Sequence, residues 1–528
     1  MEICMVLIFA CVLIFVKSQD DITVNTQLGT IKGARRRELL PNLNMTVYEF
    51  RKIPFARPPE GDLRFEKPVP YGSWNGILDA TQYSPSCYQT LGELEAFLQN
   101  KNISEDCLYL NVYVPYSVSS SNNKSVMVWI HGGGYSTGQA SLYDGAYLAF
   151  WGDVIVVTVN YRLNVFGFFS YGDIKGNFGL WDQKLAIQWV NDNIQSFGGN
   201  KQSITIFGES SGGFSVGLHS IIPSNRGLFQ RAILQSGTAM STYTTGIITK
   251  DASKTVAYSL NCSQTDSYLL KQCLKNVPVD VLFKASQKKD FISSTLLIPF
   301  APVIDGDLLT DNPKDILLNT TSAGYVFYRT LDVVFGTVTG ESKILINIFK
   351  SGVETLLQFN VTDHIPRSVL CNFLAPDIAI VGYNDLRVSK AICEKYGQEN
   401  DSIDLSLNIL NAYSDFLFDI PSVRSLRAHQ NGNGRQFQYL FSAASPIPLL
   451  GNNPPWFKKA EHSSDVFFEF PNTTFLKPAE MILTTNFIKY LTNFLCYCHF
   501  IVLNENLTIA EWARQNDHRT YVKKVFLY

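Results

Sequence analysis

Residues 204–217 pass from a strand-like segment through a glycine-rich turn into a run of small and apolar residues. The strand-like segment is ITIF (204–207), the turn is GESSG (208–212), and GFSVG (213–217) follows. A turn this sharp lifts the hydroxyl of Ser210 above the sheet, and only glycine fits where the crossing backbones crowd it. The context predicts a nucleophilic serine between a strand and a helix, with an ordinary glycine turn as the alternative.

Further apolar segments predict the body of the fold. SVMVWI (125–130), VIVVTV (154–159) and ITIF (204–207) are almost continuously apolar, which is typical of parallel strands covered on both faces. DQKLAIQWVNDN (182–193) has the pattern of a helix. This repetition predicts an α/β fold, with a central mostly parallel sheet flanked by helices. Residues 250–450 are less regular, and we expect helical insertions over one end of the sheet, above the active site.

The composition excludes several classes of protein and of binding partner. Apolar residues make up 46% and charged residues 17% of the 528 residues, which excludes disorder, collagen and coiled coil for most of the chain. Lys and Arg total 44 against 46 for Asp and Glu, with no run of like charges, so we expect no nucleic-acid partner. The length alone suggests several domains. No linker or repeat divides the chain, however, and we expect a single domain over residues 19–528.

The N-terminus predicts the compartment. Residues 4–16 form an apolar run too short to span a bilayer comfortably, and small Ser18 precedes a polar segment. We interpret residues 1–18 as a signal peptide of a secreted protein. Glu2 and the lack of a basic residue before the run leave an uncleaved anchor as the alternative. A later apolar stretch, 494–503, is too short for a membrane span, and no ER-retention or GPI-type ending follows.

Sequons and cysteines agree with secretion, with the ER lumen left open. Eight cysteines remain once Cys4 and Cys11 leave with the signal, as suits an oxidising compartment. No Cys/His spacing fits a zinc site, and we expect no metal or cofactor. Eight N-x-S/T sequons predict a glycoprotein, at Asn44, Asn102, Asn123, Asn261, Asn319, Asn360, Asn472 and Asn506.

A second glycine motif, HGGG (131–134), follows the segment 125–130. Glycines allow backbone N–H groups to point at a developing oxyanion, and those of Gly133, Gly134 and Ser211 would form a three-donor hole. A plain loop at the end of a strand is the alternative.

A general base is harder to find from residues alone. Five histidines lie beyond the segment that directly follows the serine motif: His364, His429, His462, His499 and His518. In an α/β-hydrolase the order along the chain is serine, acid, histidine. His462 lies in the polar loop 459–465, where an isolated histidine is usually a solvated surface residue, so the pattern alone does not choose it.

Seven stretches together carry a family resemblance. From about residue 22 to 480 the chain resembles the type-B carboxylesterases, the family that includes the cholinesterases. FGGNKQSITIFGESSG (197–212) and EDCLYLNVYVP (105–115) are similar to the two signatures of that family. Also similar are IPFARPPEGDLRF (53–65), NYRLNVFGF (160–168), GNFGLWDQKLAIQWV (176–190), QSG (235–237) and APVIDG (301–306). The resemblance implies an α/β-hydrolase fold and ester hydrolysis.

The resemblance also implies roles for single residues. Ser210 matches the nucleophile, Glu341 the acid and His462 the histidine of the family, with Gly133, Gly134 and Ser211 as oxyanion donors. Ser342 stands where a glycine commonly follows the acid, which loosens that match. Two disulfides and two buried, non-catalytic ion pairs are implied as well: Cys87–Cys107, Cys262–Cys273, Arg64–Glu105 and Arg162–Asp182. Cys371, Cys393, Cys496 and Cys498 stay unassigned.

Three departures from the family bear on substrate and tail. The segment 87–107 lacks the tryptophan with which cholinesterases bind choline, so acetylcholine loses its cation–π partner. Leu296 and Ile298 are aliphatic where acetylcholinesterase has aromatic side chains, so we expect a roomier acyl side. Residues 493–506 do not resemble the usual segment, and a divergent tail or an error in the deduced reading frame are both open.

We therefore expect a secreted serine carboxylic-ester hydrolase that works through an acyl-enzyme on a small neutral ester. The alternative is a catalytically silent, cholinesterase-like adhesion protein. The presence of Ser210, Glu341 and His462 together favours the enzyme. A triacylglycerol lipase and any oligomeric state remain open at this stage.

Overall fold

The computed structural model describes residues 20–40, 43–91, 100–116, 123–262, 266–287, 298–398, 402–448, 451–496 and 524–527. The predicted signal peptide (1–18), Asn506, Cys498, Leu296 and most of the C-terminal tail lie outside these residues. No helix in the described ranges combines the length and the apolar character needed to cross a membrane.

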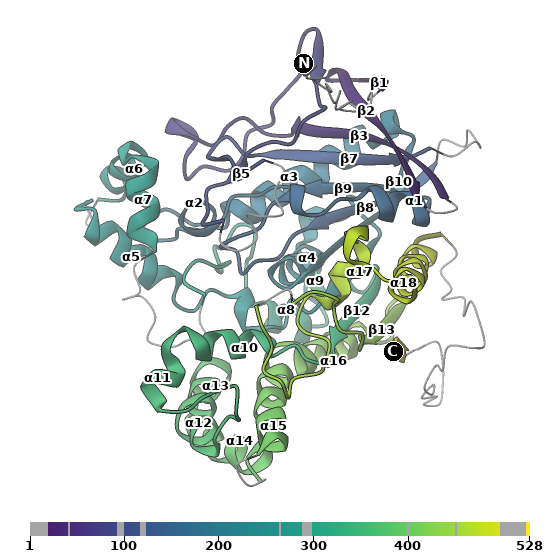
Figure 1. The fold of residues 1–528 in the computed structure, drawn as a ribbon. Coiled ribbons are helices and arrows are strands. Elements are labelled where there is room, and N and C mark those ends of the chain that lie inside the picture. The colour runs from purple at the N-terminus through teal and green to yellow at the C-terminus, as the bar shows by residue number, and fades with distance from the viewer. Residues whose placement is uncertain are drawn as a thin grey trace, which may run out of the picture.

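A twelve-stranded sheet runs through the molecule (Figure 1), in the order β1-β2-β3-β7-β9-β8-β10-β11-β12-β13-β14, with β4 beside β2. The pairs along the order from β9 to β14 are parallel, and those along the order from β1 to β9 are antiparallel. The side pair of β2 with β4 is parallel. The strands are β1 (Asp20–Thr26), β2 (Gly29–Leu40), β3 (Leu43–Pro54), β4 (Ile77–Asp79), β7 (Tyr109–Pro115), β8 (Lys124–Ile130), β9 (Ile155–Val159), β10 (Gly199–Glu209), β11 (Arg231–Gln235), β12 (Asp332–Val338), β13 (Gln436–Phe441) and β14 (Lys524–Leu527). A separate pair joins β5 (Ser86–Cys87) and β6 (Ile103–Ser104).

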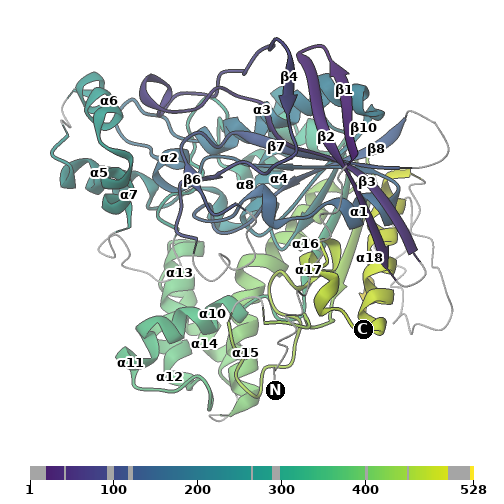
Figure 2. The ribbon, with the colours of Figure 1, turned by 45° about the horizontal axis from the view of Figure 1, so that its top comes forward.

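Helices cover the sheet and extend beyond it. They are α1 (Ala146–Gly152), α2 (Asn164–Phe168), α3 (Phe178–Asn193), α4 (Ser211–Ile221), α5 (Thr249–Ser259), α6 (Ser267–Asn276), α7 (Val279–Ser286), α8 (Pro313–Leu318), α9 (Ala323–Tyr328), α10 (Lys343–Ile348), α11 (Glu354–Leu357), α12 (Arg367–Val369), α13 (Ala375–Tyr383), α14 (Val388–Tyr396), α15 (Ile403–Ser414), α16 (Ile420–His429), α17 (Ser464–Glu469) and α18 (Pro478–Cys496). Helices α10 to α15 gather into one group beside the sheet (Figure 2). The predicted α/β class, a mostly parallel sheet flanked by helices, is confirmed.

The predicted elements appear with small differences. The three predicted strands are β8, β9 and β10, and the predicted helix 182–193 is α3. This helix begins four residues earlier, at Phe178, because Asn177 adopts a φ of 58° and turns the chain into it. The insertion predicted for 250–450 is mostly helical, but it also contains β12 and β13, two strands of the central sheet.

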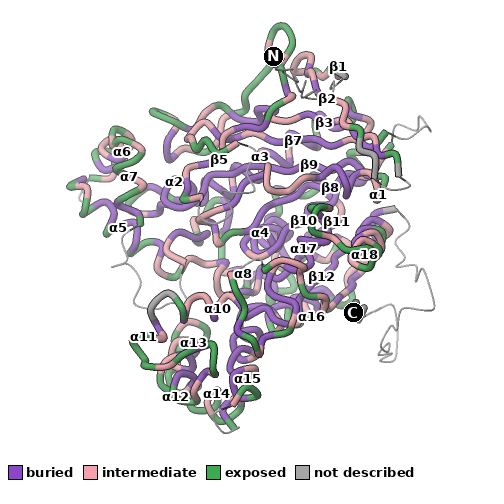
Figure 3. Tube along the Cα trace, viewed as in Figure 1, coloured by how far each residue is buried: buried purple, intermediate pink, exposed green. Residues whose placement is uncertain are grey.

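Both faces of the central strands are buried, whereas outer helices, loops and the edge strands β1 and β4 carry most of the exposed residues (Figure 3). Alternate residues of a strand point to opposite faces. Thus Val128 of β8 packs into one apolar core, while Trp129 packs into the other. The second core also contains Phe207 and side chains of α1, α17 and α18. These helices therefore cover the face on which the candidate site is built.

Candidate functional site

Ser210 occupies a tight turn between β10 and α4. Its φ is 56° and its ψ is −123°, a conformation that costs a non-glycine residue about 1–3 kcal/mol. Glycines on either side relieve the crowding. A Cβ on Gly208 would lie 2.5 Å from the Ile130 carbonyl oxygen, and one on Gly212 would lie 2.0 Å from the same atom. The partly exposed Ser210 side chain is thus raised at the end of the strand.

Glu341 and His462 meet directly, although 121 residues separate them. Glu341 follows β12, His462 precedes α17, and a bridge between Gly340 and Glu461 holds their two loops together. The Nδ1 atom of His462 lies 2.6 Å from Oε2 of Glu341. The other oxygen, Oε1, accepts hydrogen bonds from Ser236 Oγ at 2.6 Å and from the Val338 N–H at 2.9 Å. Both carboxylate oxygens are therefore fixed.

The opposite edge of the imidazole faces the residue before the serine. Nε2 of His462 lies 3.0 Å from Oε1 of Glu209, as an ion-pair contact. Within the described part of the chain, Nε2 has no hydrogen-bond partner. Ser463 donates to the same Glu209 oxygen at 2.7 Å, and the Phe418 ring lies 5.0 Å from the imidazole. The imidazole of His462 therefore contacts the Ser210 turn at Glu209, the residue before the serine.

Burial and charge act in opposite directions on this pair. Burial alone would lower the pKa of His462, but the charge of Glu209 and the hydrogen bond to Glu341 outweigh it and raise that pKa. For Glu209, burial is the largest effect and raises the pKa, while His462 and Ser463 act against it. The imidazole therefore lies between two carboxyl groups in a water-poor setting that favours its protonated form.

Glu209 is a residue of the site that was not predicted from the sequence. It is the variable residue before the serine in GESSG, and nothing local indicates that it points toward a histidine more than 250 residues away. A glutamate placed just after the predicted buried strand 204–207 was the signal that could have marked it, because the structure buries this carboxyl.

The HGGG loop passes beside the serine. A Cβ on Gly132 would lie 3.2 Å from the Ser210 Cβ. Gly133 and Gly134 have φ angles of 105° and 61°, which favour glycine. Neither N–H group donates to a described residue, and Ser211 is the first residue of α4, where N–H groups lack intrahelical acceptors. This arrangement leaves donors available for an anion beside Ser210.

Three disulfides form within the described residues: Cys87–Cys107, Cys262–Cys273 and Cys371–Cys393. The first two were predicted from the resemblance and are confirmed. The third joins two of the four cysteines that the sequence left unassigned. It closes a 22-residue separation within the α12–α14 region.

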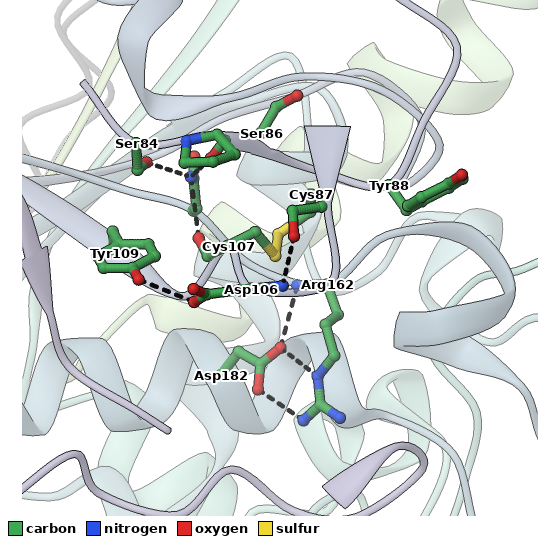
Figure 4. The surroundings of a disulfide bond; sticks show 12 residues. Ser84, Ser86, Cys87, Tyr88, Asp106, Cys107, Tyr109, Arg162 and Asp182 are labelled. Carbon is green, nitrogen blue, oxygen red and sulfur yellow. Dashed lines mark hydrogen bonds and ion pairs between the residues drawn. A yellow bond between two sulfur atoms is a disulfide. The ribbon is translucent and has the colours of Figure 1, made fainter. Parts of the chain in front are cut away.

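The two predicted ion pairs are also present and buried. Arg162 contacts Asp182 through Nε at 2.8 Å and Nη2 at 2.7 Å, next to the Cys87–Cys107 disulfide (Figure 4). Arg64 contacts Glu105 at 2.7 Å and 2.6 Å and also donates to the Val277 carbonyl. None of these contacts includes a residue of the Ser210 turn.

Other predicted sites can be placed as follows. Ile298 is partly buried, and seven of the eight sequon asparagines lie within the described residues and are exposed. Across the described ranges, no three His, Cys, Asp or Glu side chains form a group that could hold a metal ion.

Comparison with known proteins identifies the relatives of this arrangement. Residues 20–522 match the Carboxylesterase family. The chain belongs to the carboxylesterase family. Carboxylesterase 1D of Rattus norvegicus is 34% identical over 508 residues, covering 89% of this chain and 84% of that protein. Acetylcholinesterase of Bungarus fasciatus is 32% identical over 509 residues, covering 92% and 80%.

A cholinesterase of Mus musculus is 42% identical over 314 residues, covering 57% of this chain and 51% of that protein. That alignment spans about half the length of the mouse cholinesterase. Membership of the carboxylesterase family confirms the predicted resemblance and is consistent with an α/β-hydrolase fold. It supports an enzyme that hydrolyses carboxylic esters.

Proposed function

We propose that this carboxylesterase-family protein hydrolyses small neutral esters with Ser210 as nucleophile, His462 as general base and Glu341 as the acid that orients it. One observation carries the proposal. Glu341 binds Nδ1 of His462 at 2.6 Å, and Nε2, on the edge that faces Glu209 in the Ser210 turn, has no hydrogen-bond partner among the described residues.

The geometry supports a two-step reaction. Nε2 of His462 takes the proton of the Ser210 hydroxyl as its oxygen attacks the ester carbonyl, and Glu341 stabilises the imidazolium. The N–H groups of Gly133, Gly134 and Ser211 hold the resulting oxyanion. The imidazolium then gives its proton to the departing alcohol. A water molecule attacks the acyl-enzyme through the same base and releases the acid.

The substrate differs from choline esters in this proposal. No tryptophan lies between Cys87 and Cys107 to bind a quaternary ammonium group. The aliphatic Ile298 supports a roomier acyl side than an aromatic residue would allow. We therefore expect p-nitrophenyl butyrate to be a better substrate than acetylcholine.

Secretion is part of the same proposal. Residues 1–18 act as a signal peptide, residues 19–528 form one domain, and the exposed sequons accept glycans. The three disulfides support an oxidising compartment, because such bonds rarely persist in the cytosol. A catalytically silent adhesion homologue is not favoured, since serine, acid and histidine are all present.

Hydrolysis of p-nitrophenyl acetate and butyrate tests the proposal. Wild type should turn over both esters, Ser210→Ala should be inactive, and Ser389→Ala in α14 should behave as wild type. A fluorophosphonate probe should label Ser210, as peptide mapping would reveal. Activity that survives Ser210→Ala unchanged would refute the assignment of the nucleophile, and an inert, folded wild type would favour the silent homologue.

A further inference from the structure

Four residues at or near the ends of neighbouring strands form a row beneath α17. The register aligns one residue from each of β10, β11, β12 and β13: Glu209, Gln235, Gly336 and Tyr439. Residues in register across parallel strands point to the same face of the sheet. The residues two positions earlier pack into the apolar core that α17 covers, so the row faces this helix.

Gly336 leaves the space in which the Tyr439 side chain reaches the other residues of the row. A Cβ at this position would lie 2.1 Å from the Tyr439 ring, so only glycine lets the phenol cross β12. The Tyr439 hydroxyl accepts a hydrogen bond from Gln235 Nε2 at 3.0 Å and donates to Oδ2 of Asp465 at 2.6 Å. Tyr439 therefore joins β11 to α17 across the intervening strand.

Gln235 connects both parts of the catalytic site. Its backbone carbonyl accepts the N–H of Ser210 at 2.9 Å. Its side-chain Nε2 lies 2.7 Å from Oε1 of Glu469 and 3.2 Å from Oδ2 of Asp465. These two carboxyl groups are four residues apart on α17, the helix that starts two residues after His462, and so share one helix face.

The two carboxyl groups of α17 cannot both carry a charge. Both are fully buried, and in the described residues neither forms an ion pair with an arginine or lysine. Asp465 receives two donors: Tyr439 donates to Oδ2 at 2.6 Å, and the Val466 N–H donates to Oδ1 at 3.1 Å. The two hydrogens of Gln235 Nε2 are taken by its nearer acceptors, Glu469 and Tyr439. Glu469 receives one donor, and its Oε2 has no partner among the described residues. Like charges this close exclude double ionisation, and the group with fewer donors keeps the proton.

The charged groups around the pair agree with this assignment. Burial is the largest effect on both carboxyls; it raises the pKa of Asp465, and with the charge of Asp465 it holds that of Glu469 well above its ordinary value. Glu209 also faces Glu469 and acts in the same direction, while His462 acts on Asp465 and favours its charged form.

We propose that Glu469 is a positioning residue that works as a neutral carboxylic acid. Bonded to Gln235, it holds α17, and with it His462, against the strand whose carbonyl holds Ser210. This inference rests on the proposed function, because positioning is read out through His462 and Ser210.

Four variants of the full chain test the inference on p-nitrophenyl butyrate. Glu469→Gln copies the neutral acid and keeps an oxygen for Gln235, whereas Glu469→Leu and Gln235→Leu break the bond between them. Glu394→Gln, on the exposed face of α14, is the matched control. We expect Glu469→Gln to keep kcat within threefold and the acid limb of kcat/KM in place. Glu469→Leu and Gln235→Leu should lower kcat at least tenfold with little change in KM.

Three results would overturn the inference. A tenfold loss of kcat in Glu469→Gln, or an acid limb moved by more than half a pH unit, would mean that a carboxylate charge is what matters. Wild-type kcat in Glu469→Leu would remove the positioning role. Should the leucine variants fail to fold, the glutamine variant still decides the question.

Thermal unfolding separates this inference from the proposed function. Between the ordinary pKa of glutamic acid, about 4.3, and the raised pKa in the folded protein, only the folded state keeps this proton. Wild type therefore loses stability as pH rises through that range, and Glu469→Gln does not. Its gain in Tm over wild type should grow from pH 5 to pH 8. A constant difference would refute the neutral acid, even if wild type proved to have no esterase activity.

Discussion

Replacing Glu341 by glutamine changes one oxygen in the candidate site. The bonds from Ser236 and Val338 to Oε1 survive, so the turn after β12 should keep its shape. The Oε2 position, 2.6 Å from Nδ1 of His462, becomes an N–H donor. Nδ1 must then accept, which places the only imidazole proton on Nε2, where the proton of Ser210 has to arrive.

The contact distance sets the size of the effect. At 2.6 Å and an effective dielectric constant of about 20, a carboxylate and an imidazolium attract by about 6 kcal/mol. This energy corresponds to between four and five powers of ten in rate, at about 1.36 kcal/mol per tenfold. Measured losses for the equivalent change in a serine triad are about 10⁴ in kcat, so we expect a loss of about 10⁴ here.

Burst kinetics with p-nitrophenyl acetate measure this loss. Ser210→Ala gives the background rate of hydrolysis, and Glu394→Gln is the control. The acylation rate and kcat should fall together while the far-ultraviolet circular dichroism spectrum and Tm stay close to wild type. A Glu341→Gln enzyme that keeps more than a tenth of wild-type kcat would refute the reasoning. It would mean that another group orients the imidazole.

Three further changes have defined outcomes. Glu209→Gln removes the charge 3.0 Å from Nε2 and should lower the pKa of His462 by about 1–3 units. Because the base acts deprotonated, the acid limb of kcat/KM should move to lower pH. An unmoved limb in a pH–rate profile would contradict this. Gly212→Ala places a Cβ 2.0 Å from the Ile130 carbonyl and should cost at least about 1–3 kcal/mol, so an unchanged Tm in calorimetry would contradict the crowding. The double change of Cys371 and Cys393 to serine should cost about 2–4 kcal/mol in denaturant titrations yet keep kcat, and loss of activity in the folded variant would contradict a bracing role.

The secondary structure and turns that depend on residues close together in the chain could be predicted from the sequence. Strand, turn and helix around Ser210 are encoded within 14 residues, because burial and glycine placement act locally there. Gln235 and Glu469 show the limit of such reasoning. They touch only because strand register brings together segments 234 residues apart, and an isolated glutamate in an apolar helix gives no sign of its partner. Likewise, four unassigned cysteines allow several pairings, and only the folded α12–α14 region selects Cys371–Cys393.

The insertion between β12 and β13 has a consequence for engineering. The chain leaves β12, passes Glu341, forms α10 to α16, and returns to the sheet as β13, which pairs in register with β12. The bridge between Gly340 and Glu461 joins the loop that follows β12 to the loop that follows β13. Hydrolytic chemistry and the walls that surround it are thus separable parts of one polypeptide. Exchanging residues 343–414, helices α10 to α15, for the corresponding stretch of a relative is a route to new substrate preference that leaves Phe418, 5.0 Å from the His462 ring, in place.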